Sequence, residues 1–205
     1  MYARLKRCAD FLVAFCGLLA LSPLLLPIGI VIFLQDFHNP IFIQLRLGRF
    51  KRPFYMYKFR SMSVGTERSE TGYYCFPGDS RITPVGRLLR RYSLDELPQL
   101  YNILLGDMSF VGPRPPVHDE LDDEVFDDQD LNYLNQRFQL QPGLTGLAQI
   151  TGRNDLGWKE KLYFDHLYFQ KFALVPFWTD FMILFATFRA VFASKGEYDS
   201  ATPNR

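Results

Sequence analysis

The alternation of apolar and polar positions divides the chain into three regions. Residues 11–34 contain no charged side chain, and the run is long enough for a helix that enters a membrane. The stretches NPIFIQLRLG and RPFYMYKFRSM alternate in polarity, so they predict two strands joined by a basic turn over residues 48–53. Over residues 172–195, Phe recurs at spacings of three and four, as one helical face requires. The pattern predicts an α+β protein behind an apolar N-terminal helix.

Proline interrupts the apolar run near its middle. Pro23, directly after Ser22, and Pro27 each lack the backbone donor that a helix needs, so they kink or break it. The hydroxyl of Ser22 is suited to satisfy a backbone group freed there. Basic residues flank the run on both sides, as expected of a re-entrant helix with both ends in the cytosol. A straight signal anchor, with residues 36–205 outside the cell, and a cleaved signal peptide remain alternatives.

Two further helices are predicted in the middle of the chain. Thr83 followed by Pro84 is typical of a helix start, with Thr as the cap and Pro at the first helical position. A second helix should begin within SLDE, residues 93–96, and end near Gly106. Residues 63–83 are rich in Gly, Ser, Thr and charge, which indicates a surface loop.

The aromatic C-terminal segment predicts an amphipathic helix that Pro176 opens. Asp180 and Arg189 interrupt its apolar face, which argues against a second membrane span. A helix lying in the membrane interface and a helix buried in a protein core both fit this pattern. The residues that recur on the expected face are Phe177, Phe181, Phe185, Phe188 and Phe192.

Composition excludes some classes of function. The formal net charge of +1 argues against broad nucleic-acid binding. The three cysteines and three histidines show neither a disulfide framework nor zinc-ligand spacing, which fits chemistry that faces the reducing cytosol. Residues 119–130 are strongly acidic, and a solvated loop or helix face explains them better than a metal site, since they lack calcium-loop spacing.

The adjacent carboxylates Asp95 and Glu96 admit two interpretations. Asp95 as the cap or first-turn residue of a helix would put Pro98 where no backbone donor is needed, which explains the pair structurally. The chemical alternative starts from Arg90 and Arg91, because arginines and a helix N-terminus attract phosphate. A carboxylate in such a site fits a nucleophile that attacks phosphorus, beside a Mg²⁺ ligand.

Three blocks of sequence resemble the bacterial sugar transferase family, the small monotopic phosphoglycosyl transferases. They are KFRSM (58–62), RRYSLDELPQLYNILLGDMSFVGPRP (90–115) and PGLTGLAQITGRN (142–154), and they follow an apolar segment with a central Ser-Pro. Their order and spacing make the resemblance specific, and it covers residues 1–195. The acidic run after GPRPP is longer than expected of the family.

The resemblance implies a reaction and a set of site residues. Such enzymes move a sugar phosphate from a UDP-sugar to undecaprenyl phosphate and release UMP, by a ping-pong mechanism through a covalent phosphosugar-Asp95 intermediate. Mg²⁺ is required, and Glu96 is its expected ligand. The substrate contacts implied by the resemblance are Arg90 and Arg114, together with three residues that structural ion pairs would explain equally well, Lys58, Arg60 and Arg153.

The resemblance also implies the domain organisation and the setting. We expect a re-entrant membrane helix broken at Ser22-Pro23 (1–36), a mainly helical cytosolic catalytic domain with a small β-hairpin (37–171), an interfacial helix (172–195) and a flexible tail (196–205). The protein would lie in the cytosolic leaflet of the bacterial inner membrane, at the first membrane step of a glycan pathway, with downstream glycosyltransferases as candidate partners. A non-catalytic UDP-sugar-binding partner and a polyprenyl-phosphate phosphatase are the competing hypotheses.

Overall fold

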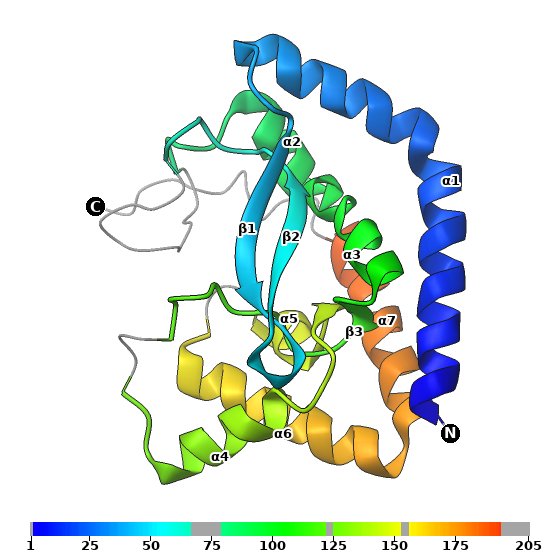
Figure 1. Ribbon diagram of the computed structural model, residues 1–205, viewed down its shortest axis with the longest axis vertical. Helices are drawn as coiled ribbons and strands as arrows, with labels where there is room; N and C mark the ends of the chain where they lie inside the picture. Colours follow the sequence, from blue (N-terminus) through cyan, green and yellow to red (C-terminus); the bar gives the residue numbers. More distant parts are fainter. Residues whose placement is uncertain (1, 67–78, 122–124, 153–155, 194–205) are drawn as a thin grey trace.

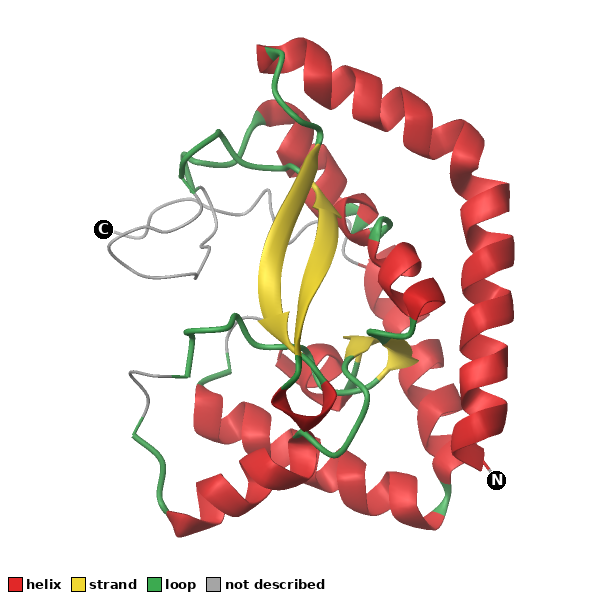
Figure 2. Ribbon diagram, in the orientation of Figure 1, coloured by secondary structure: helices red, strands yellow, loops and turns green. Residues whose placement is uncertain are grey.

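The computed structural model describes residues 2–66, 79–121, 125–152 and 156–193, so the predicted tail lies outside the described residues. In chain order the helices are α1 (Tyr2–Asp36), α2 (Pro84–Arg91), α3 (Gln99–Leu105), α4 (Asp128–Arg137), α5 (Leu147–Gly152), α6 (Trp158–Leu174) and α7 (Pro176–Ala193). The strands are β1 (Ile41–Leu47), β2 (Pro53–Phe59), β3 (Ser109–Val111) and β4 (Gly143–Thr145). The described chain is mostly helical, and Figure 2 shows helices around a central hairpin.

α1 is one continuous helix that bends (Figure 1). Both Pro23 and Pro27 lie inside it, so the chain kinks here and the predicted break at Ser22-Pro23 does not occur. Pro23 cannot donate to the carbonyl of Leu19, and the Ser22 hydroxyl donates to that oxygen instead, at 2.8 Å. Among the described residues, α1 is long and apolar enough to cross a membrane.

The predicted hairpin is confirmed. β1 and β2 pair antiparallel, from Ile41 opposite Phe59 to Leu47 opposite Pro53, and the basic turn joins them. Phe54 and Met56 of β2 face inward and pack with residues of α1 and α3 in one hydrophobic cluster. One face of the hairpin is therefore fixed against α1 and against α3, the helix that follows the predicted carboxylate pair.

The two central helices begin differently. Thr83 caps α2 as predicted, because its side chain accepts a hydrogen bond from the amide of Gly86 at 2.9 Å. SLDE does not start α3 directly. It forms a separate 3₁₀ turn, η2 (Leu94–Glu96), whose cap residue Ser93 has a positive φ of 55°, and α3 begins only after Pro98. Asp95 thus lies in a first turn, but it does not cap α3.

Two short segments pair in a way that the polarity pattern did not indicate. β3 and β4 form a parallel pair, with Ser109 opposite Gly143 and Val111 opposite Thr145. The pair packs on α6 and α7, where Tyr168, Ile183 and Val111 form a buried cluster. This small sheet fixes the start of the GPRPP segment.

The C-terminal helix starts at Pro176 as predicted, while α6 runs on to Leu174, beyond the expected start of the interfacial segment. α7 has one buried side, with Thr179, Asp180 and Ile183. Its other side exposes large apolar residues to solvent, namely Phe177, Trp178, Phe181, Met182, Phe185 and Phe188. The helix is therefore a two-sided element, half docked on the domain and half apolar surface.

Both ends of α1 are bonded to the rest of the domain. Near its start, Lys6 forms an ion pair with Asp180 of α7 at 2.7 Å, and Arg7 donates to the carbonyls of Ile103 and Leu104 at the end of α3. At its end, Asp36 forms an ion pair with Arg60, just after β2. α1 is thus attached to one domain at both termini.

Candidate active site

The carboxylate pair lies at the junction of η2 and α3. Asp95 is buried, with 8% of its surface exposed, and Glu96 follows it in the same tight turn. Ser93, directly before the turn, holds a left-handed conformation that residues other than Gly rarely adopt. Such strained backbone is concentrated at functional sites, where the surrounding structure compensates for it.

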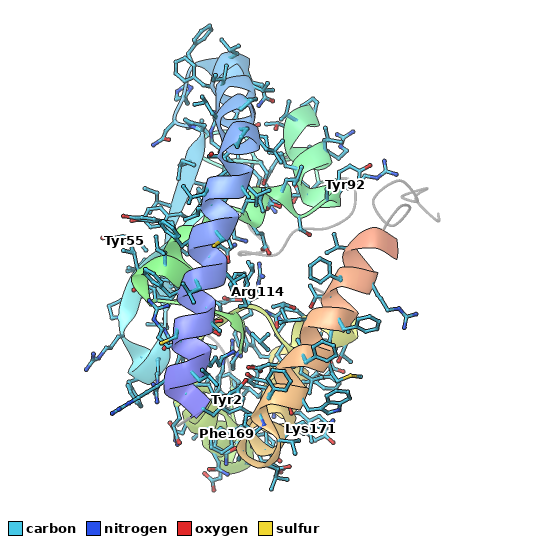
Figure 3. All side chains as sticks on the ribbon, turned by 90° about the vertical axis from the view of Figure 1, so that its right-hand side faces the viewer. Tyr2, Tyr55, Tyr92, Arg114, Phe169 and Lys171 are labelled. Carbon is cyan, nitrogen blue, oxygen red and sulfur yellow. The ribbon has the colours of Figure 1, made fainter. Side chains whose placement is uncertain are left out.

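Two cations hold Glu96. Lys58 Nζ lies 2.8 Å from Glu96 Oε1, and Arg114 Nη2 lies 3.1 Å from the same oxygen. Lys58 comes from β2 and Arg114 from the loop after β3, so the hairpin, η2 and this loop converge on one carboxylate. Figure 3 shows Arg114 in the middle of the molecule, between α1 and α7.

The electrostatics of the two acids differ. Burial, followed by the negative charge of Glu96, raises the pKa of Asp95 above its ordinary value. Burial also disfavours the charged form of Glu96, but Lys58 and Arg114 outweigh it and lower the pKa of Glu96. Glu96 is therefore a fixed carboxylate at neutral pH, and Asp95 is a carboxylate whose negative charge is poorly compensated.

The cations are affected in turn. Burial lowers the pKa of the Lys58 ammonium, although Glu96 opposes the shift. The charge of Glu96 raises the pKa of Arg114, whose side chain is 42% exposed. A half-exposed guanidinium beside the partly exposed Glu96 and the buried Asp95 is suited to contact an anionic ligand that approaches from solvent.

The remaining predicted contacts differ in their surroundings. Arg90 of α2 donates from Nε to Ser61 Oγ at 2.8 Å, and its charge lowers the pKa of Asp95, so it belongs to the same site. Arg60 is buried and bonds to Asp36 and to the carbonyl of Asn39, at the end of α1. Its contacts are those of a structural ion pair. Arg153 lies outside the described residues.

Sequence reasoning missed Asn102 as a residue that supports the site. Its side chain is fully buried, accepts from the amide of Tyr57 at 3.0 Å and donates to the carbonyl of Tyr55 at 2.7 Å. It thereby pairs with β2 next to Lys58 and links this strand to α3. Asn is unfavourable inside a helix, and that local mismatch is the signal that could have identified it.

The donor set fits a magnesium ion held mainly by substrate. The described residues contain no group of three or more His, Cys, Asp or Glu side chains that could enclose a metal. Mg²⁺ commonly uses one or two carboxylates together with substrate phosphates and water, and the expected ligand Glu96 supplies one such carboxylate. Both cation contacts described for Glu96 end on Oε1.

Comparison with known proteins gives one consistent result. A family model described as bacterial sugar transferase matches residues 1–194. The chain is 41% identical to the exopolysaccharide production protein ExoY of Rhizobium meliloti, over 94% of this chain and 88% of that protein. It is 39% identical to the undecaprenyl-phosphate galactose phosphotransferase of Salmonella typhimurium and 37% identical to a UDP-glucose:undecaprenyl-phosphate glucose-1-phosphate transferase of Klebsiella pneumoniae. These matches cover 95% and 94% of this chain, but only 42% and 41% of the two longer relatives.

Proposed function

This chain belongs to the bacterial sugar transferase family, and from that premise we propose that it transfers a sugar 1-phosphate from a UDP-sugar to undecaprenyl phosphate and releases UMP. The names of the relatives support the general reaction. The observation that carries the proposal for this chain is the buried Asp95 beside Glu96, whose charge Lys58 and Arg114 neutralise. This arrangement keeps one acid available for attack among cations that attract phosphate.

In the proposed first step, a carboxylate oxygen of Asp95 attacks the β-phosphorus of the UDP-sugar. A bond forms between Asp95 and phosphorus, the bond to the bridging oxygen breaks, and UMP leaves with that electron pair. Burial supports the role, because a poorly solvated carboxylate is a stronger nucleophile than one in water.

In the second step, a phosphate oxygen of undecaprenyl phosphate attacks the same phosphorus. The bond to Asp95 breaks, the carboxylate is restored, and the sugar diphosphate lipid leaves. Because both steps use one phosphorus-binding site in turn, ping-pong kinetics follow from the scheme.

The neighbouring residues bind and orient the phosphates. Arg114 and Arg90 are proposed to contact the donor diphosphate, and Lys58 to hold Glu96 ionised and in place. Glu96 would hold Mg²⁺. When bound, Mg²⁺ would neutralise negative charge on the transferring phosphate.

We further propose that α1 is re-entrant and that the domain faces the cytosol of the bacterial inner membrane. The bend at the prolines and the hydroxyl of Ser22, bonded to Leu19, support a helix that turns within one leaflet. The attachment of both helix ends to one domain, through Lys6 and Asp36, supports a return to the same membrane side. The exposed apolar side of α7 would lie in the interface.

The first experiment measures UMP release by the purified, detergent-solubilised protein. A panel of UDP-sugars is supplied with Mg²⁺, with and without undecaprenyl phosphate, to wild type, Asp95→Asn and Asp128→Asn. Asp128 is an exposed carboxylate at the start of α4 and serves as the matched control. Lipid-dependent UMP from one donor, lost only in Asp95→Asn, is the expected outcome.

Other outcomes are equally informative. Turnover that survives in Asp95→Asn would exclude Asp95 as the nucleophile. Inorganic phosphate released from the lipid without a donor would favour the phosphatase. Donor binding without turnover would favour the non-catalytic partner. Mass spectrometry of the protein incubated with donor alone should find the phosphosugar on the peptide that contains Asp95.

A further inference from the structure

A second arginine forms a hydrogen bond to the backbone of Arg114. Arg137, the last residue of α4, is buried, with 4% of its surface exposed, and its guanidinium donates to the carbonyl oxygen of Arg114. The side chain of Arg114 points the other way and reaches Glu96. The two arginines thus contact each other through one backbone carbonyl, with only Arg114 at the candidate active site.

Arg137 is itself fixed by α6. Its Nη1 atom lies 2.8 Å from Asp165 Oδ2, and its guanidinium lies over the ring of Trp158, 5.0 Å from the centroid. Asp165 is 2% exposed. An acid, an aromatic ring and a backbone carbonyl therefore surround one guanidinium and together limit how it can turn.

Stability does not explain this pair well. Taking two charges out of water costs free energy that their attraction often fails to repay, and apolar replacements of buried ion pairs are frequently neutral or stabilising. Burial raises the pKa of Asp165 to about 6 even with Arg137 beside it, which indicates that desolvation outweighs the attraction. A positioning role accounts for the cost.

We infer that the Arg137–Asp165 pair positions Arg114 for contact with the donor phosphates. The inference rests on the proposed function for its effect on rate. Arg114 is followed by two prolines, and its side chain is 42% exposed, so its guanidinium is oriented by the backbone that carries it together with the contact to Glu96. With the carbonyl of Arg114 released, its side chain should sample orientations away from Glu96.

The test replaces the pair by apolar residues of similar size, Arg137→Met with Asp165→Leu. We expect the double variant to keep its fold, judged by circular dichroism and a melting temperature at or above that of wild type. We expect kcat for UMP release to fall about 10–100-fold, the usual cost of losing a positioning residue, with a smaller change in KM. Lys159→Met is the control, because it removes the ion pair that the exposed Lys159 forms with Asp130 between the same two helices, and it should leave kcat unchanged.

A second readout does not depend on turnover. Hydrogen exchange followed by mass spectrometry should show faster exchange in the peptide over residues 108–121 in the double variant, with exchange in α3 unchanged. If wild type releases no UMP while this peptide is loosened, the proposed function fails and the positioning contact stands. If the folded double variant matches wild type in both exchange and kcat, the inference is overturned.

Arg137→Lys covers the case in which the double variant does not fold. Lysine keeps the charge, but its single ammonium cannot reproduce the fork that reaches both Asp165 and the carbonyl of Arg114. We expect a folded protein with faster exchange over residues 108–121 and a several-fold lower kcat. Wild-type exchange and kcat in this variant would equally overturn the inference.

Discussion

Asp95 is subject to opposed electrostatic influences. Burial and the charge of Glu96 disfavour its ionised form, while Lys58, Arg90 and Arg114 favour it. The balance leaves its pKa raised, so the folded protein holds a charge that the unfolded chain holds more easily. A residue retained at such a cost is better explained by chemistry than by helix formation.

The first prediction is that Asp95→Asn stabilises the protein while abolishing turnover. An acid whose pKa is raised on folding contributes stability below its unfolded pKa, and that contribution is lost as the pH rises through the folded pKa. Above its folded pKa the wild type has lost this contribution, and the neutral amide avoids the loss at every pH. Thermal unfolding at pH 7 should show a higher melting temperature, by roughly 2–4 °C for each kcal/mol gained. Asp128→Asn should melt like wild type, and a lower melting temperature for Asp95→Asn would contradict the argument.

The second prediction concerns the acid side of the pH–rate profile. Asp95 must be ionised to attack, so kcat/KM should fall as the pH drops through its raised pKa. Glu96→Gln removes the charge that raises this pKa and leaves Lys58 and Arg114 in place. The acid limb should therefore move to lower pH, although the rate itself falls by at least the roughly 10–100-fold that the loss of an outer-shell partner of a metal costs.

Lys58→Met should move the acid limb of the pH–rate profile in the opposite direction. Loss of this ammonium removes a charge that lowers the pKa of Asp95, so the acid limb should move to higher pH. UMP release measured from pH 5 to pH 9 at low donor concentration gives the limb for each variant. If the acid limbs of wild type, Glu96→Gln and Lys58→Met coincide, Asp95 is not the titrating group.

At the residue scale, the sequence predicts the site where neighbours in the chain are also neighbours in space. Asp95 and Glu96 are adjacent, and the motif blocks name Lys58, Arg90 and Arg114. The roles of Asn102, Arg137 and Asp165 arise from contacts between segments far apart in the chain, with no local pattern that names the partner. Arg60 stands in a motif block, but it bonds to Asp36 and to the carbonyl of Asn39, at the end of α1 and just beyond it.

At the element scale, local chemistry predicts the starts that depend on a cap or a proline. Thr83 and Pro176 begin helices where expected, because their effects act within one turn. The start of α3 was misplaced, since the left-handed Ser93 inserts a 3₁₀ turn that no capping rule anticipates. β3 and β4 were missed because three residues are too short to show a period.

The third prediction tests the close packing of α2 against the backbone of Ser61. A Cβ added at Gly86 would lie 1.9 Å from the carbonyl oxygen of Ser61, a backbone atom that cannot swing aside. Gly86→Ala should therefore destabilise the protein by about 3 kcal/mol or more, at the upper end of overpacking costs. Because α2 carries Arg90, UMP release should fall as well.

The matched control for Gly86→Ala is Gly17→Ala in α1. There the added Cβ meets only the end of Leu100, at an ordinary 3.5 Å, and alanine is the better helix former. Chemical denaturation should show no loss of stability for Gly17→Ala. Equal stability of the two variants would mean that α2 and the Ser61 segment separate readily, contrary to the packing described.

At the scale of the whole molecule, α1 is an apolar helix whose two ends contact the domain that carries the candidate active site. Its start contacts α7 and the end of α3, and its end contacts the segment after β2. The exposed apolar side of α7 adds a second apolar surface. Between the contacts at its two ends, α1 bends around the domain (Figure 1), whereas a straight helix of 35 residues would extend for about 52 Å.

The fourth prediction addresses membrane topology through this bend. Cys8, Cys16 and Cys75 are replaced, and single reporter cysteines are placed at the exposed positions Ala3 and Gln129. In the re-entrant arrangement, an impermeant maleimide should label neither reporter in spheroplasts with an intact inner membrane and both in inverted vesicles. Labelling of Gln129→Cys from outside, with Ala3→Cys protected, would identify a straight signal anchor.

Replacing both prolines should place the two reporters on opposite sides of the membrane in a fraction of the molecules. Pro23→Ala with Pro27→Ala restores the missing backbone donors and favours a straight helix long enough to cross the bilayer. A fraction of these molecules should expose the Gln129 reporter outside. In sealed inverted vesicles supplied with UDP-sugar, UMP release should fall in proportion, because the site of these molecules then faces away from the UDP-sugar. If both reporters stay on the cytosolic side, the contacts of Lys6 and Asp36 with the domain hold the topology without the prolines.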